Sequence, residues 1–386
     1  MNESNNDLTC HTHDCDLCVI AAPGCESIAD QIDWYLKSWH ATDQTFIAKS
    51  EIIRFGTGEA KGHILESMRG KDVYIICDCF NYSVTYELCG QQQRMSPDDH
   101  FANLKRLIGA IGSKAKRITV IMPMLYEGRQ HKRTARESLD CAMALQELTS
   151  IGVSNILTFD AHDPRVQNAI PLAGFDDVHC TYQMIKALCK NVPDVKLDRD
   201  HVVVISPDEG AMGRCMYYST ILGIDLGMFY KRRDYSIVIN GKNPIVAHEY
   251  LGRDLHGKDA IVVDDMISSG GSMLDVAKQL KQRGAERIFV FSTFGLFCEG
   301  LEKFDAAYAE GEITKVFTTN LIYQPEELKA REWYASVNMS KYISYLIDTI
   351  NKGESISELL RPINRINTYV ENFKREQLER EKNAAK

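Results

Sequence analysis

Short apolar runs rich in β-branched residues recur along the chain and alternate with segments of helical periodicity. Six runs have the near-continuous apolar character of parallel strands covered on both faces: 73–77, 118–122, 155–159, 202–205, 260–263 and 288–292. Helical segments lie between them, as at 138–150 and 273–283, and each of these is followed by a glycine, a common helix stop signal. The alternation predicts α/β architecture with right-handed crossovers.

The strand–helix pattern occurs once before about residue 190 and again after about residue 200, within a chain of 386 residues that can form two or three domains. The segment 191–200 is polar, contains Pro193 and has no clear period, so we place a domain boundary there. Sequence identity between the halves is too faint to prove a repeat. The predicted divisions are a polar Cys/His-rich extension, two similar α/β domains and a closing helix with a charged tail: 1–18, 19–195, 196–345 and 346–386.

Charge and hydropathy exclude several classes of protein. A net charge of −8 argues against a general nucleic-acid-binding protein, which usually carries a broad basic face. No apolar run approaches the roughly 18–20 residues of a membrane helix, and the polar N-terminus does not have the pattern of a secretory signal. The twelve cysteines, several inside apolar runs, suit a reducing compartment. A cytoplasmic location follows as the default.

The N-terminal extension contains Cys10, His11, His13, Cys15 and Cys18. Thiols and imidazoles at such short spacing could hold zinc tetrahedrally. The Cys-x4-Cys-x2-Cys spacing, however, has no matching second pair nearby, so zinc is the less favoured interpretation.

The segment 261–272 carries the most informative chemistry. A predicted strand ends in Asp264 and Asp265 and continues into Ser268-Ser-Gly-Gly-Ser272 before a helix. Ligands of open α/β sheets bind at the carboxyl ends of strands, where glycines let backbone N–H groups approach a phosphate and the two carboxylates suit a sugar diol. A capped helix after a Gly-Ser turn is the alternative. We favour a ribose 5-phosphate site made of Asp264, Asp265, Ser268, Ser269, Gly270, Gly271 and Ser272.

This segment resembles the motif for phosphoribosyl pyrophosphate (PRPP) that phosphoribosyltransferases and PRPP synthetases share. Similarity to PRPP synthetases extends from about residue 50 to about residue 360. It includes, in order, 55–59, 123–133, 160–162, 206–208, 231–233, 319–322 and 353–357. The resemblance implies two phosphoribosyltransferase-like domains, each a mainly parallel sheet flanked by helices.

The reaction that the resemblance implies is diphosphoryl transfer from Mg²⁺-bound ATP to the 1-hydroxyl of ribose 5-phosphate, giving PRPP and AMP for nucleotide biosynthesis. Such a transfer needs in-line positioning and charge neutralisation more than covalent participation by protein. The implied ATP-binding residues are Phe55, Glu59, Arg129, Gln130 and His131. The implied metal ligands are His162 and Asp208, and the implied catalytic residues are Lys231 and Arg233.

The resemblance also implies a homo-oligomer, dimer-based and up to a hexamer. The charge and hydropathy given above indicate no nucleic-acid or membrane partner. Two other interpretations stay open: a phosphoribosyltransferase, for which we find no base-binding hood, and a non-catalytic regulatory homologue. The second rests on departures from the family pattern. Ser268-Ser269 replaces an Asp-Thr pair, His131 an aspartate and Thr57 an Asn or Asp, and 82–99 is an insertion without a counterpart.

Overall fold

A computed structural model describes residues 16–233 and 245–384. The chain folds into two compact units. The first unit contains Met1–Thr158, Asp163–Asp177 and Ser340–Ser357, and the second contains Phe159–His162, Val178–Met339 and Glu358–Lys386. Each unit is made of several separate chain segments, so this spatial division cannot be compared directly with continuous domain limits. The domain limits expected from the sequence stay predictions. In the described part of the chain, no helix is long and apolar enough to cross a membrane.

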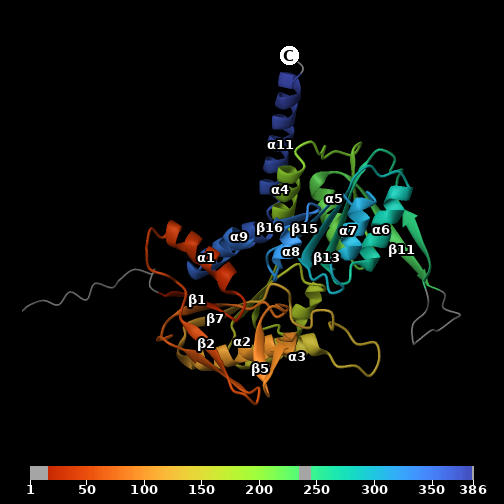
Figure 1. Cartoon of the computed structure of the whole chain (residues 1–386). Coiled ribbons are helices and arrows are strands. Elements are labelled where there is room, and N and C mark those ends of the chain that lie inside the picture. Colours follow the sequence, from red (N-terminus) through yellow and green to blue (C-terminus); the bar gives the residue numbers. More distant parts are fainter. Residues whose placement is uncertain (1–15, 234–244, 385–386) are drawn as a thin grey trace, which may run out of the picture. The chain divides into compact units, whose positions relative to one another are not determined.

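The first unit is built on a five-stranded sheet (Figure 1). Its strands are, in spatial order, β1 (Leu17–Ala21), β4 (Asp72–Ile76), β7 (Arg117–Ile121), β8 (Asn155–Phe159) and β9 (Gly174–Val178). The pairings β1–β4, β4–β7 and β7–β8 are parallel. Its helices are α1 (Glu26–Trp39), α2 (Pro97–Ile111), α3 (Asp140–Ser150) and α9 (Ser340–Asn351), with a 3-10 helix at Pro164–Ala169. Two hairpins complete it: β2 (Ser50–Arg54) with β3 (Ala60–Ile64), and β5 (Thr85–Leu88) with β6 (Gln91–Arg94).

The second unit is built on a seven-stranded sheet that is parallel except for the β11–β12 pair. Its strands are, in spatial order, β12 (Ile245–Leu251), β11 (Asp225–Arg233), β10 (Val202–Ser206), β13 (Asp259–Ile267), β14 (Ile288–Gly295), β15 (Lys315–Thr319) and β16 (Tyr334–Val337). Its helices are α4 (Thr181–Asn191), α5 (Met212–Leu222), α6 (Gly271–Gln282), α7 (Glu302–Ala309), α8 (Glu326–Lys329), α10 (Ser357–Leu360) and α11 (Ile363–Ala384). The α/β architecture and all six predicted strands are confirmed.

Alternate residues of the second sheet face different helices. Val262 and Val290 belong to a core that includes Met273 and Leu280 of α6. Phe291 faces the other way and makes an edge-to-face contact with Tyr218 of α5 at 5.9 Å. Helices therefore cover both faces, which explains why the strands are apolar on both sides.

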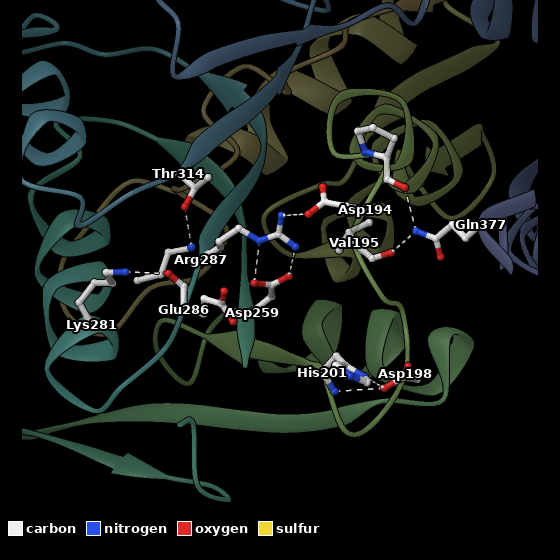
Figure 2. Close-up of polar contacts among 12 residues, drawn as sticks. Asp194, Val195, Asp198, His201, Asp259, Lys281, Glu286, Arg287, Thr314 and Gln377 are labelled. Carbon is white, nitrogen blue, oxygen red and sulfur yellow. Dashed lines mark hydrogen bonds and ion pairs between the residues drawn. The ribbon is translucent and has the colours of Figure 1, made fainter. Parts of the chain in front are cut away.

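The two sheets share a structural motif at the amino ends of their central strands. In the first unit, Arg117 Nε donates to Asp72 Oδ1 at 2.8 Å. In the second, Arg287 Nε donates to Asp259 Oδ1 at 2.9 Å (Figure 2). Each aspartate follows Gly-Lys and each arginine precedes isoleucine. The two units therefore share a local sequence pattern and the same ion pair at this point of their sheets.

Helix α11 docks on the second unit beside α4, as Figure 1 shows. Ile366, Val370 and Phe373 are buried, as their helical spacing predicts. Farther along, Gln377 Nε2 donates to the carbonyl oxygens of Pro193 and Val195, both at 2.9 Å (Figure 2). The first part of the tail therefore belongs to the folded unit.

Candidate active site

The loop between β13 and α6 has the backbone that an anion-binding turn requires. Gly270 adopts a φ of +81° just before α6, and no described side chain caps the start of this helix. A Cβ at Gly270 would lie 2.4 Å from Cε2 of Phe304, so this position accepts only glycine without rearrangement. The uncapped N–H groups at the helix start are the donors that commonly bind a phosphate.

Strand β13 continues through the acidic pair and ends only at Ile267, because Asp264 and Met266 still pair with Ser292 and Phe294 of β14. The carboxylates therefore lie inside the last part of the strand rather than after it. Asp265 is buried at 4% exposure, whereas Asp264 is half-buried. The two residues are in direct contact, because the Asp265 N–H donates to Asp264 Oδ1 at 2.9 Å.

His162 joins this acidic pair. Its Nδ1 lies 2.7 Å from Oδ2 of Asp265, and its side chain is 38% exposed. Burial acts to raise the pKa of Asp265, but the hydrogen bond with His162 and the nearby Arg214 hold that pKa below its usual value. Burial and the charge of Asp265 raise the pKa of Asp264 well above its usual value.

Asp160 anchors the segment that carries His162. Its φ of +39° is unusual for a non-glycine residue. The buried carboxylate accepts hydrogen bonds from Thr293 Oγ1 at 2.7 Å and from the Cys180 N–H at 3.2 Å, and it pairs with His179 Nδ1 at 2.9 Å. Although burial opposes ionisation, these partners lower the pKa of Asp160 to about 2. The anchored backbone fixes the position of His162.

Asp208 follows β10, the strand next to β13. Its Oδ1 accepts hydrogen bonds from the N–H groups of Gly210 at 3.0 Å and Ala211 at 3.3 Å, so this oxygen orders the turn before α5. Among the described residues, no group of three or more His, Cys, Asp or Glu side chains is gathered to hold a metal ion. The metal-binding role of His162 and Asp208 therefore stays a prediction.

The predicted catalytic residues Lys231 and Arg233 lie at the end of β11, which pairs with both β10 and β12. Their side chains lie outside the described part of the structure, as do residues 234–244 between β11 and β12. Their catalytic role stays a prediction.

Comparison with known proteins finds one matching family model in each half of the chain. The family model for the N-terminal domain of ribose phosphate pyrophosphokinase matches residues 17–152, and that for the phosphoribosyl synthetase-associated domain matches residues 237–361. The ribose-phosphate pyrophosphokinase of Pasteurella multocida is 30% identical over 311 residues, covering 79% of this chain and 89% of the relative. The chain belongs to the ribose-phosphate pyrophosphokinase family.

Other members of the family agree across similar lengths. Ribose-phosphate pyrophosphokinase A of Dictyostelium discoideum is 26% identical over 316 residues, covering 81% of this chain and 90% of the relative. The crystal structure of phosphoribosylpyrophosphate synthetase from Mycobacterium smegmatis superposes with a TM-score of 0.72 at 21% identity, covering 88% of this chain and 99% of that structure. The fold expected for the ribose-phosphate pyrophosphokinase family is thus confirmed.

In this family member, the first predicted nucleotide segment is the loop that joins β2 to β3. Within it, the Phe55 N–H donates to the Glu59 carbonyl and the Gly58 N–H donates to the Phe55 carbonyl, both at 2.8 Å. Phe55 is 49% exposed, which excludes the alternative of a buried core phenylalanine. Thr57 Oγ1 donates to Glu59 Oε2 at 3.0 Å, so the residue that departs from the family pattern orients the predicted ligand-binding carboxylate.

The second predicted nucleotide segment follows β7. Arg129 and Gln130 are exposed, whereas His131 turns inward and its Nε2 lies 3.5 Å from Oδ2 of Asp163. Arg165 and His131 help to lower the pKa of Asp163 to about 2. The imidazole that replaces an aspartate here therefore contacts a carboxylate of the protein itself.

Arg214 of α5 is a site residue that the sequence did not reveal. It is half-buried, its Nη2 lies 3.4 Å from the Asp160 carbonyl, and the charges of Asp160, Asp265 and Asp264 raise its pKa although burial acts to lower it. It balances the acidic pair electrostatically. Arg214 lies on the helix that follows β10, and β10 pairs with β13. Only this place in the fold could have indicated its role.

The zinc interpretation of the Cys/His-rich extension stays a prediction. Cys10, His11, His13 and Cys15 lie outside the described residues. Cys18 lies inside β1, and burial raises the pKa of its thiol to about 12.

Proposed function

We propose that this chain is a ribose-phosphate diphosphokinase that transfers the diphosphoryl group of magnesium-bound ATP to the 1-hydroxyl of ribose 5-phosphate, giving PRPP and AMP. In the reaction the bond between the β-phosphorus of ATP and the oxygen that bridges it to the α-phosphorus breaks, and a bond from the sugar O1 to the β-phosphorus forms. The hydroxyl proton passes to solvent, and AMP carries the negative charge of the departing α-phosphate.

The reaction type rests on membership of the ribose-phosphate pyrophosphokinase family. The substrate site rests on the continuous segment from Asp264 to the start of α6, with His162 held beside Asp265. We assign the uncapped N–H groups of Gly271 and Ser272 to the 5-phosphate, together with the hydroxyls of Ser268, Ser269 and Ser272. Asp264 is the more exposed carboxylate, so we assign it to the ribose hydroxyls, with Asp265 acting mainly through His162.

The residues present fit a magnesium ion bound together with ATP. A histidine ligand typically passes its other ring N–H to a carboxylate, and Nδ1 of His162 has such a partner in Asp265. Magnesium usually keeps several waters and takes few protein ligands, so His162 and Asp208 are a sufficient protein contribution. The ion would supply charge neutralisation on the phosphates.

Lys231 and Arg233 would place positive charge on the β-phosphate as charge shifts during transfer. Phe55 would contact the adenine ring, and Glu59, Arg129, Gln130 and His131 would line the nucleotide. The chain would be cytoplasmic and would function as a dimer-based homo-oligomer, with a hexamer as one outcome. Light scattering of the purified protein would measure the oligomer size.

AMP release that requires both substrates tests the proposal. The purified chain is incubated with Mg²⁺ and ATP, with and without ribose 5-phosphate, and nucleotides are separated chromatographically. We expect AMP only when ribose 5-phosphate is present. AMP at background level would reject the diphosphokinase assignment and favour a regulatory homologue, whereas PRPP consumption with a free base would indicate a phosphoribosyltransferase.

A further inference from the structure

Within the insertion at residues 82–99, residues 85–94 fold into a hairpin beside the predicted nucleotide loop. Strands β5 and β6 pair in antiparallel register and are joined by Cys89 and Gly90, whose φ angles are +50° and +77°. Two positive φ values in a two-residue connection are typical of the tight turn that matches strand twist. We propose that the β5–β6 hairpin is a positioning element that holds the loop 55–59 in its nucleotide-binding conformation. This inference rests on the proposed function.

The tip of the hairpin contacts the loop through its backbone and through Leu88. The Cys89 N–H donates to the Gly56 carbonyl at 2.9 Å. Leu88 packs so closely on Gly58 that a Cβ there would lie 2.7 Å from its Cδ1. Both glycines of the loop therefore touch the hairpin.

Arg54, the last residue of β2, links the loop to the hairpin and to α2. Its Nη1 donates to the Gly58 carbonyl at 3.0 Å. The same guanidinium lies 3.9 Å from the ring centroid of Tyr86 on β5, and Nη1 lies 3.6 Å from Oδ1 of Asp99 on α2. The Arg54 side chain is only 11% exposed, so these contacts are largely shielded from water.

The other end of the insertion reaches the second nucleotide segment. Tyr126 Oη donates to Oδ1 of Asp98 at 2.6 Å, and its ring stacks on Phe101 of α2 at 4.3 Å. Tyr126 precedes Arg129 by three residues. The insertion therefore contacts both predicted nucleotide segments of the first unit. It contacts the first at and just before the loop 55–59, and the second at Tyr126, just before Arg129.

A loop with two glycines samples many backbone conformations unless its surroundings restrict it. If only a fraction of molecules has the binding conformation, the apparent dissociation constant for the nucleotide rises by the inverse of that fraction. Loss of the hairpin should therefore weaken ATP binding. Binding of ribose 5-phosphate should not change, because the residues assigned to that substrate belong to the second unit.

A precise truncation is available because the Met95 N–H donates to the Val84 carbonyl at 2.9 Å, so these two residues are already neighbours. Residues 85–94 are replaced by Asn-Gly, which forms a two-residue turn between them. We expect the Kd and KM for ATP to rise about tenfold, as for a drop of the competent fraction to one tenth. The KM for ribose 5-phosphate should stay within about twofold.

Two variants of Tyr86 separate its ring contact with Arg54 from the hydrogen bond between its hydroxyl and Asp99. Tyr86→Ala removes the ring and should raise the KM for ATP about threefold to tenfold, while Tyr86→Phe keeps the ring and should restore a near-normal value. Gln92→Ala, on the exposed side of β6, is the matched control and should leave both KM values unchanged.

The measurements are steady-state kinetics for each substrate and direct ATP binding by calorimetry, with circular dichroism to verify folding. A Kd for ATP that is unchanged in both Tyr86→Ala and the truncated chain would overturn the inference. Equal rises in both KM values would also overturn it, because they would indicate a general structural role. A wild type that binds ATP but forms no AMP would reject the proposed function instead, and the Kd values would still decide the role of the hairpin.

Discussion

The Nδ1 atom of His162 lies 2.7 Å from Oδ2 of Asp265, although the residues are 103 positions apart in sequence. His162 follows β8, whereas Asp265 lies inside β13. With Nδ1 engaged by a buried carboxylate, Nε2 is the nitrogen that would serve as a metal ligand. This contact links the segment assigned to magnesium with the segment assigned to ribose 5-phosphate.

His162→Ala should raise the Mg²⁺ concentration for half-maximal activity about tenfold to a hundredfold, and Asp265→Asn should have a similar or smaller effect through the histidine. Activity is titrated with Mg²⁺ at fixed total ATP. The control is His201→Ala, because His201 Nδ1 also lies 2.7 Å from an aspartate, Asp198, in an exposed pair of the same unit (Figure 2). An unchanged Mg²⁺ requirement in His162→Ala would remove it from the metal site.

Gly270→Ala should destabilise the second unit and weaken ribose 5-phosphate binding. Gly270 and Gly311 have similar φ values of +81° and +71°, but of these two glycines only Gly270 would bring the new Cβ against another residue, Phe304. The left-handed conformation should cost about 1 kcal/mol at either position, and the clash should add about 1–3 kcal/mol at Gly270. Urea unfolding and the KM for ribose 5-phosphate measure the effects. Equal losses of stability in Gly270→Ala and Gly311→Ala would contradict the close packing of this loop.

Asp160→Asn should lower stability in a pH-dependent manner. The pKa of Asp160 is about 2 in the folded chain against an ordinary 3.8, so the carboxylate form is favoured by folding. This difference in pKa corresponds to about 2 kcal/mol of folding stability. The stabilisation is fully present above about pH 5 and is lost as pH falls through 3.8 toward 2.

Urea unfolding of the wild type and Asp160→Asn at pH 7, 4 and 3 tests this dependence. The difference in the free energy of unfolding between the wild type and the variant should be smaller at pH 3 than at pH 7. Asp200→Asn, at an exposed carboxylate, should change stability by less than about 0.5 kcal/mol at each pH. A gap that stays constant from pH 7 to pH 3 would show that the ionised form of Asp160 is not what stabilises the fold.

Lys231→Ala should lower kcat by roughly a hundredfold to a thousandfold, the usual scale for one lost charge donor at the transition state. The KM for ribose 5-phosphate should change little, because the lysine acts on the transferred group. Lys329→Ala, at a surface lysine that pairs with Glu326, is the control. Near-normal turnover in Lys231→Ala would refute its catalytic role.

The sequence predicted the central strands well because burial on both faces gives long β-branched runs, as in β13 and β14. The antiparallel edge pair β11–β12 escaped prediction, since polar residues such as Lys231 and Glu249 interrupt its apolar pattern. The assignment of α9 to the first unit was also unpredictable, because it depends on long-range contacts such as that of Asn351 Nδ2 with Asp72 Oδ2 at 3.0 Å.

The segment proposed to bind ribose 5-phosphate could be proposed from sequence alone because its residues are contiguous. Its surroundings could not: Arg214, Asp160 and Thr293 are brought near it only by the order of strands in the sheet. The same holds for the insertion, whose sequence shows a possible turn at Cys89-Gly90 but not its contact with Gly56. Local patterns predicted the elements, and tertiary packing determined which side chains meet.

Phosphorus NMR of one reaction mixture tests the central claim most directly. The chain is incubated with Mg²⁺, ATP and ribose 5-phosphate, and the α- and β-phosphorus signals of all products are followed over time. Diphosphoryl transfer predicts AMP and PRPP in equal amounts with no accumulation of ADP. Formation of ADP with a ribose bisphosphate, or no change in the ATP signals, would contradict the account.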